Sequence, residues 1–98
     1  MIREKNTRCY RTKRKEVLIM LYNKLAFGIV ISRLRVGKEM SQETLSALAG
    51  ISRSHLALLE SGKKTVRLDT LWQIAYALDV QPHELISLTE QEMTYAKK

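Results

Sequence analysis

The chain has 98 residues, of which 45% are hydrophobic and 28% are charged, a composition typical of one small globular domain. A single Cys excludes a disulfide scaffold and a four-thiolate metal site. The Cys and the two His also lack the close spacing of zinc ligands. We therefore expect no metal, no cofactor and no small-molecule ligand, because so short a chain leaves little room for a substrate cavity.

Positive charge is concentrated at the N-terminus. The chain carries a net charge of +7, and residues 1–16 supply +5 of it through seven basic and two acidic side chains. Such an arm attracts polyanions, although the same composition is typical of a solvated chain end.

An apolar run at residues 17–22 follows the basic arm and invites a signal-peptide interpretation. Asn23 and Lys24 interrupt the run, no small-residue cleavage site follows, and about 20 apolar residues would be needed to span a bilayer. We therefore expect a cytoplasmic protein with no membrane contact, in which residues 1–21 form an N-terminal extension. Translation from Met20 is the alternative that the sequence leaves open, and it would remove the basic arm.

The first predicted helix carries Phe27, Ile31 and Leu34 on one face, at the spacing i, i+4, i+7. Gly37 is a helix-stop signal, so this helix should end before it.

The next two predicted helices are separated by a short turn. Ser41 is a suitable N-cap for the second helix, which Gly50 ends, and Ser52 is a suitable N-cap for the third, which ends at residues 60–62. A small residue, a glycine free to adopt positive φ, an aliphatic residue and a cap fill the turn at residues 49–52. This pattern is typical of a helix-turn-helix.

Two more helices complete the predicted domain. The fourth has an apolar stripe at helical spacing, and Asp79 is expected to end it in the left-handed conformation. The stripe consists of Leu68, Leu71, Ile74, Ala75 and Leu78. Pro82 should begin a short fifth helix. The prediction is an all-α, compact bundle of five short helices at residues 22–88, with residues 89–98 as a C-terminal tail.

Several sequence strings keep one register across the predicted helices. They are Leu34-Arg35, Met40-Ser41-Gln42-Glu43-x-Leu45, Ala49-Gly50-Ile51-Ser52-Arg53-Ser54-x-Leu56-x-x-Leu59-Glu60-x-Gly62-Lys63 and Leu68-x-Thr70-Leu71-x-x-Ile74-Ala75-x-Ala77-Leu78-x-Val80-x-Pro82-x-Glu84-Leu85. Together they span about two thirds of the chain. In these positions the chain resembles the lambda-repressor-like family, the xenobiotic-response-element (XRE) type of helix-turn-helix DNA-binding protein.

The resemblance implies that the third helix lies in the major groove of double-stranded DNA. It implies that the base-reading residues are Arg53, Ser54, Ala57 and Leu58. The Arg53 guanidinium can pair with O6 and N7 of guanine, and Ser54 can donate or accept a hydrogen bond. Leu58 replaces the polar residue common at this position, and is expected either to meet a thymine methyl or to pack on its own helix.

Phosphate contacts are expected on both sides of this helix, at Gln42, His55, Lys63, Lys64 and Thr65. Gln42 begins the second helix, where free backbone N–H groups can share a phosphate with its amide. The residues after the third helix would anchor the DNA backbone without reading sequence. An ordinary surface histidine is an equally good interpretation of His55.

The resemblance also implies an internal ion pair between Arg35 and Glu60, which would tie the first helix to the end of the third. We interpret this pair as scaffold rather than as part of the DNA contact.

Two positions depart from the family pattern. Ser46 replaces the usual Ala, so its hydroxyl should bond to a carbonyl oxygen one turn earlier. Val66 and Arg67 replace a Pro-Ser pair, which leaves the fourth helix without its usual N-cap unless Thr65 substitutes for it.

One reading helix covers only a few base pairs, so we expect a homodimer on a pseudo-palindromic operator. The expected interface residues are Val80, Pro82, Leu85, Ile86 and Leu88, with Trp72 and Tyr76 as further candidates. Ordinary core packing is the alternative for each of them, and above all for Leu85.

The leading function is that of a sequence-specific transcription regulator without a ligand domain. A restriction-modification controller fits the compact chain best; a phage or mobile-element repressor and the antitoxin of a toxin–antitoxin pair are the alternatives. We expect no catalytic residues, because Cys9 has no local partner and the acidic residues are dispersed. A protein-interaction module or an RNA binder is disfavoured, because few aromatic side chains are available to stack on bases.

Overall fold

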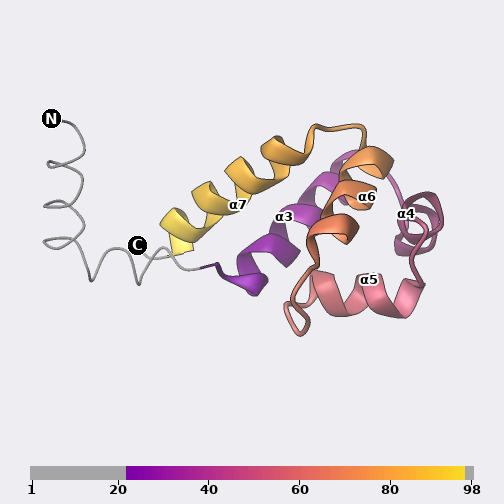
Figure 1. Ribbon diagram of the computed structural model, residues 1–98, viewed down its shortest axis with the longest axis horizontal. Coiled ribbons are helices and arrows are strands. Elements are labelled where there is room, and N and C mark those ends of the chain that lie inside the picture. Colours follow the sequence, from indigo (N-terminus) through magenta and orange to yellow (C-terminus); the bar gives the residue numbers. More distant parts are fainter. Residues whose placement is uncertain (1–21, 97–98) are drawn as a thin grey trace, which may run out of the picture.

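The computed structural model describes residues 22–96, so the predicted N-terminal extension at residues 1–21 lies outside the described residues (Figure 1). The described part consists of five helices and contains no strand, which confirms the predicted all-α bundle. The helices are α3 (Lys24–Gly37), α4 (Gln42–Ala49), α5 (Arg53–Glu60), α6 (Leu68–Leu78) and α7 (Pro82–Ala96).

The boundaries of α4 and α5 follow from their caps. The Ser41 hydroxyl accepts a hydrogen bond from the Thr44 N–H, and the Ser52 hydroxyl accepts one from the His55 N–H, both at 3.0 Å. Gly50 ends α4 at φ +76°, in the left-handed region where a side chain would be strained. The predicted helix-turn-helix is therefore present.

The first helix is one residue longer than predicted, because α3 includes Gly37. At its start the Asn23 side chain accepts a hydrogen bond from the Leu25 N–H at 2.9 Å. The rings of Tyr22 and Phe27 lie 6.4 Å apart, a hydrophobic staple that fixes where the chain enters α3. Burial raises the pKa of the Tyr22 hydroxyl, and a hydrogen bond with the backbone of Val66 opposes this shift.

The two departures from the family pattern have different outcomes. The Ser46 hydroxyl donates to the carbonyl oxygen of Glu43 at 3.0 Å, as predicted. Thr65, however, does not cap α6: the N-cap position is Arg67, which makes no capping hydrogen bond through its side chain. The Asp69 carboxylate accepts a hydrogen bond from the Thr70 N–H instead, at 2.8 Å. At the other end of α6, Asp79 has φ +60°, the predicted left-handed stop.

The prediction of a short last helix followed by a tail at residues 89–98 was wrong, because α7 continues to Ala96. Leu85, Thr89 and Met93 are buried at every fourth residue, so the inner face of α7 extends well beyond Leu88. The polar Thr89 concealed this period in the sequence. Its hydroxyl donates to the Leu85 carbonyl oxygen at 2.7 Å, which satisfies it within the helix.

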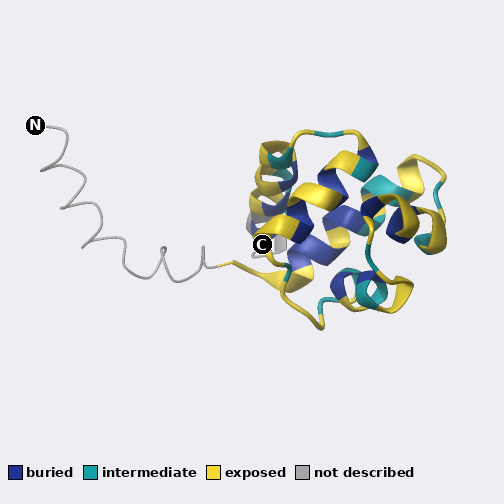
Figure 2. Ribbon diagram, turned by 45° about the vertical axis from the view of Figure 1, so that its right-hand side comes forward, coloured by how far each residue is buried: buried dark blue, intermediate teal, exposed yellow. Residues whose placement is uncertain are grey.

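The core lies between the inner faces of the helices, which Figure 2 shows as buried. Helix α3 packs against α5 and α7, and α4 packs against α5 and α6. The core residues are Phe27, Val30, Ile31, Leu45, Ala49, Leu56, Leu59, Leu71, Ile74, Ala75, Leu78 and Leu85. Leu68, predicted to belong to the apolar stripe of the fourth helix, is instead 65% exposed at the start of α6.

Gly28 allows the C-terminal end of α5 to approach α3 closely. A Cβ atom at Gly28 would lie 2.5 Å from the carbonyl oxygens of both Leu59 and Glu60. These are backbone atoms that no side-chain rotation can move aside, so any larger residue must push the two helices apart.

We predict that Gly28→Ala lowers the free energy of unfolding by about 2 kcal/mol or more, although alanine is favoured over glycine inside a helix by about 1 kcal/mol. Urea unfolding followed by circular dichroism measures this. Gly37→Ala is the matched control, because a Cβ there would meet no atom within 4 Å, and it should be neutral or stabilising. Equal stability of the two variants would contradict the close approach at Gly28.

Candidate nucleic-acid interface

The outer face of α5 carries the four predicted base-reading residues. Arg53, Ser54 and Leu58 are exposed and Ala57 is half-buried, whereas the opposite face of α5 is buried in the core. The helix is therefore held by one face and presents the other to a partner.

A basic loop follows α5. Lys63, Lys64 and Thr65 are exposed there, directly after Gly62, whose φ of +76° turns the chain. A Cβ on Gly62 would lie 2.8 Å from a methyl carbon of Leu25, so this loop is packed closely against the start of α3. An eight-residue helix is about 12 Å long, so Arg53 and this loop bracket the outer face of α5 at its two ends.

Two of the predicted phosphate contacts are less free than the sequence suggested. His55 is half-buried and its backbone N–H is used by the Ser52 cap. The side-chain amide of Gln42 donates to the Glu60 carboxylate at 2.9 Å. A carboxamide nitrogen carries two hydrogens, so one N–H of Gln42 is left over for a further acceptor.

Arg35 and Glu60 meet in the interior, with side chains only 14% and 6% exposed. Nε of Arg35 lies 2.7 Å from Oε2 of Glu60, and Nη2 lies 3.1 Å from Oε1, a bidentate pair. Nη1 of Arg35 also donates to the carbonyl oxygen of Met40 at 2.8 Å. The structure thus joins α3, the turn before α4 and the end of α5 through one guanidinium.

The predicted dimer residues divide into two groups. Leu85 has no exposed surface and belongs to the core of its own chain, so its assignment to an interface was wrong. Its position at the start of the buried series of α7 is the physical reason. Ile86 is exposed, and Val80, Pro82 and Leu88 are half-buried.

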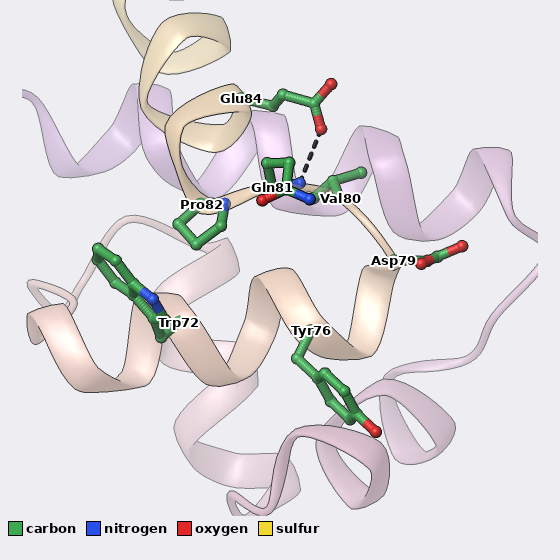
Figure 3. A pocket seen from close by; sticks show the side chains of 7 residues that line it. All are labelled: Trp72, Tyr76, Asp79, Val80, Gln81, Pro82 and Glu84. Atoms are coloured by element: carbon green, nitrogen blue, oxygen red, sulfur yellow. Dashed lines mark hydrogen bonds between the residues drawn. The ribbon is translucent and has the colours of Figure 1, made fainter.

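Exposed aromatic side chains extend this surface onto α6. Trp72 and Tyr76 line a groove of about 450 Å³ with Val80 and Pro82 (Figure 3), and Tyr76 is 83% exposed. The exposed Leu68 lies four residues before Trp72, so α6 carries an outward apolar stripe. This i, i+4, i+8 spacing was visible in the sequence, but Leu68 was assigned to the core face.

Other kinds of site find no support in the part of the chain that the structure describes. No group of three or more His, Cys, Asp or Glu side chains there could hold a metal ion. None of the helices at residues 22–96 is long and apolar enough to cross a membrane.

The helix-turn-helix, the exposed face of α5 and the adjoining basic loop define a protein of the DNA-binding class. The sequence profile of the Cro/C1-type HTH DNA-binding domain matches residues 30–91, and the chain belongs to this family. It is a DNA-binding transcription regulator, as the sequence predicted.

Similar proteins include control proteins of restriction-modification systems. The chain is 36% identical over 67 residues to the control protein C.BamHI of Bacillus amyloliquefaciens. The aligned region covers 67% of this chain and 83% of that protein. It is 34% identical over 70 residues to the control protein C.MunI of a Mycoplasma species, covering 70% and 95%. The crystal structure of the restriction-modification controller protein C.AhdI from Aeromonas hydrophila matches with a TM-score of 0.62 and 40% identity, covering 63% and 94%.

We predict that Arg35→Met lowers the free energy of unfolding by about 3 kcal/mol, because it leaves the Glu60 carboxylate buried without its cation. Arg33→Met is the matched control: Arg33 pairs with Glu92 at 3.0 Å but is 62% exposed, so its loss should cost less than about 1 kcal/mol. Chemical unfolding of both variants measures the difference. Equal losses would show that the Arg35–Glu60 pair behaves as a surface pair.

Proposed function

We propose that this regulator binds a pseudo-palindromic operator in double-stranded DNA as a homodimer, with α5 of each subunit in the major groove. One observation carries the proposal: the first turn of α5 exposes Arg53 and Ser54 directly after the helix-turn-helix turn, while the opposite face of the same helix is locked in the core. A rigid helix of this kind can enter the groove without reorganising.

In this arrangement the outer face of α5 reads base edges. Arg53 donates two hydrogen bonds to guanine, and Ser54 supplies a short hydroxyl. Ala57 lets the helix approach closely, and Leu58 packs against a thymine methyl.

The residues around α5 hold the phosphates. Lys63, Lys64 and Thr65 contact the DNA backbone beyond its C-terminal end, and His55 contacts it beside the first turn. The remaining N–H of Gln42, with the free backbone N–H groups at the start of α4, takes a phosphate on the other side.

The dimer contact lies on the surface formed by Val80, Pro82, Ile86 and Leu88, together with Trp72 and Tyr76. Large apolar side chains that are exposed together are a common mark of a protein interface. A two-fold axis through this surface would present two copies of α5 to one face of the DNA.

Among regulators of this family, the similarity to C.BamHI, C.MunI and C.AhdI supports a role as a restriction-modification controller acting in the cytoplasm. Footprinting on DNA upstream of its own gene tests this assignment. Protection beside an endonuclease or methyltransferase gene would support it. Protection beside a toxin or integrase gene would favour an antitoxin or a mobile-element repressor, and absence of any protection would favour a protein-interaction module.

Arg53→Ala and Lys63→Ala should have different effects on DNA binding. Arg53→Ala should cost about 1–3 kcal/mol per half-site and flatten discrimination at one base position, because it removes a base contact. Lys63→Ala should weaken all sequences equally and reduce the log–log salt slope by about 0.9 per subunit, because it removes only a phosphate contact.

Salt titrations of both variants, on the operator and on a duplex with one base changed, measure the two effects. If Lys63→Ala altered base preference while Arg53→Ala changed only the salt slope, the assignment of α5 as the reading helix would be wrong.

Sedimentation at micromolar concentration should give about 23 kDa, twice the 11.3 kDa of one chain. Ile86→Glu should produce monomers, since it introduces a charge into the proposed interface. Leu48→Glu, at an exposed apolar residue of α4, is the control and should leave the dimer intact. A wild-type chain that stays monomeric both free and on DNA would contradict the dimer.

A further inference from the structure

The carboxylate of Glu60 accepts more hydrogen bonds than its ion pair with Arg35 requires. The guanidinium already engages both oxygens, at 2.7 and 3.1 Å, which completes a bidentate pair. A third bond, from the Gln42 amide, reaches Oε1 at 2.9 Å. A carboxylate has about four sites that can accept a hydrogen bond, so this third bond helps to satisfy the buried charge and also ties Gln42 to Glu60.

The third bond joins the two ends of the helix-turn-helix that lie farthest from its turn. Gln42 is the first residue of α4, and Glu60 is the last residue of α5. Near the turn the two helices are joined by the backbone of residues 50–52, where the Ile51 N–H caps α4 by donating to the Ser46 carbonyl oxygen at 3.0 Å. The bond between Gln42 and Glu60 therefore connects α4 and α5 at the ends that the turn leaves unconnected.

Arg35 does not fix the first residue of α4. Its Nη1 bonds to Met40, two residues before α4 begins, while the close approach at Gly28 and the ion pair hold the end of α5 against α3. Ser41 stands between Met40 and α4, and its own side chain is used in capping Thr44. The direct connection between the start of α4 and the end of α5 is the Gln42 amide.

The two joined ends have different tasks in the proposed complex, on which this inference rests. Phosphate contacts at the start of α4 set the register of the protein on the duplex, and base edges are read from α5. If the two ends move relative to one another, phosphates can be bound while the bases are out of register. Specific binding then suffers, whereas non-specific binding does not.

We propose that Gln42 is a positioning residue that holds the phosphate-binding start of α4 in register with the base-reading face of α5, through its bond to Glu60. Its role is in discrimination between sequences, in addition to any phosphate contact made by its remaining N–H. Both α4 and α5 are about 12 Å long, so a shift of about 1 Å at one end of either helix turns that helix by about 5°.

Gln42→Met tests this, because it keeps the length of the side chain and removes the donor, while Glu60 keeps Arg35 as a partner. Binding is measured on a duplex that the wild-type chain selects from a random pool and on a scrambled duplex, together with the melting temperature. Gln73→Met is the matched control: it makes the same chemical change at an exposed residue of α6, outside the proposed DNA contacts.

We expect Gln42→Met to weaken binding to the selected duplex about tenfold more than binding to the scrambled duplex, which is the size of one misread base pair. Both duplexes also lose the phosphate contact of Gln42. Its melting temperature should lie below that of Gln73→Met, because a hydrogen bond to a buried carboxylate is lost, so binding is measured at a temperature where both variants are fully folded. Gln42→Glu should lose more discrimination than Gln42→Met, because a second carboxylate would repel Glu60.

Equal weakening on both duplexes would overturn the inference and leave Gln42 as a simple phosphate contact. Unchanged binding to both would also overturn it. A wild-type chain that shows no preference between the duplexes would overturn the proposed function together with this inference. A preference that Gln42→Met retains would overturn the inference alone.

Discussion

The C-terminal end of α5 rests on α3, and the arrangement of the proposed DNA-facing surface depends on this contact. Gly28 lets the carbonyl oxygens of Leu59 and Glu60 approach the α3 backbone, and Arg35 neutralises the Glu60 side chain beside them. An acidic residue at the C-terminal end of a helix is disfavoured by the helix dipole. Glu60 is therefore stable at this position only because Arg35, which lies 25 residues earlier in the chain on α3, neutralises its charge.

Features that depend on neighbouring residues were predictable from the sequence. Ser41, Gly50 and Ser52 define the helix-turn-helix because capping and left-handed turns involve residues within about one turn of each other. The length of α7 was not predictable in the same way, because it depends on burial against α3. Thr89 looks like a surface residue in the sequence, yet an intrahelical hydrogen bond allows it to occupy a buried position.

The candidate site shows the same division. The resemblance to the family placed Arg53, Ser54 and Leu58 on the outside of α5, and all three are exposed there. The bond between Gln42 and Glu60 could not be read from the sequence, because it connects residues 18 positions apart and depends on the angle between two helices. The role of Leu85 was ambiguous for a related reason: an apolar residue at the start of a helix suits both a core and an interface.

In the proposed complex, stability and sequence reading are carried by different residues of the same short helix. Leu56 and Leu59 are completely buried and fix α5 through packing, whereas Arg53 and Ser54 make no contribution to the core. Substitution on the outer face can therefore alter the proposed DNA contacts while the fold is retained. The polar cluster of Arg35, Gln42 and Glu60 serves both roles, since its bonds hold the scaffold together and, in the proposed complex, also fix the geometry in which bases are read.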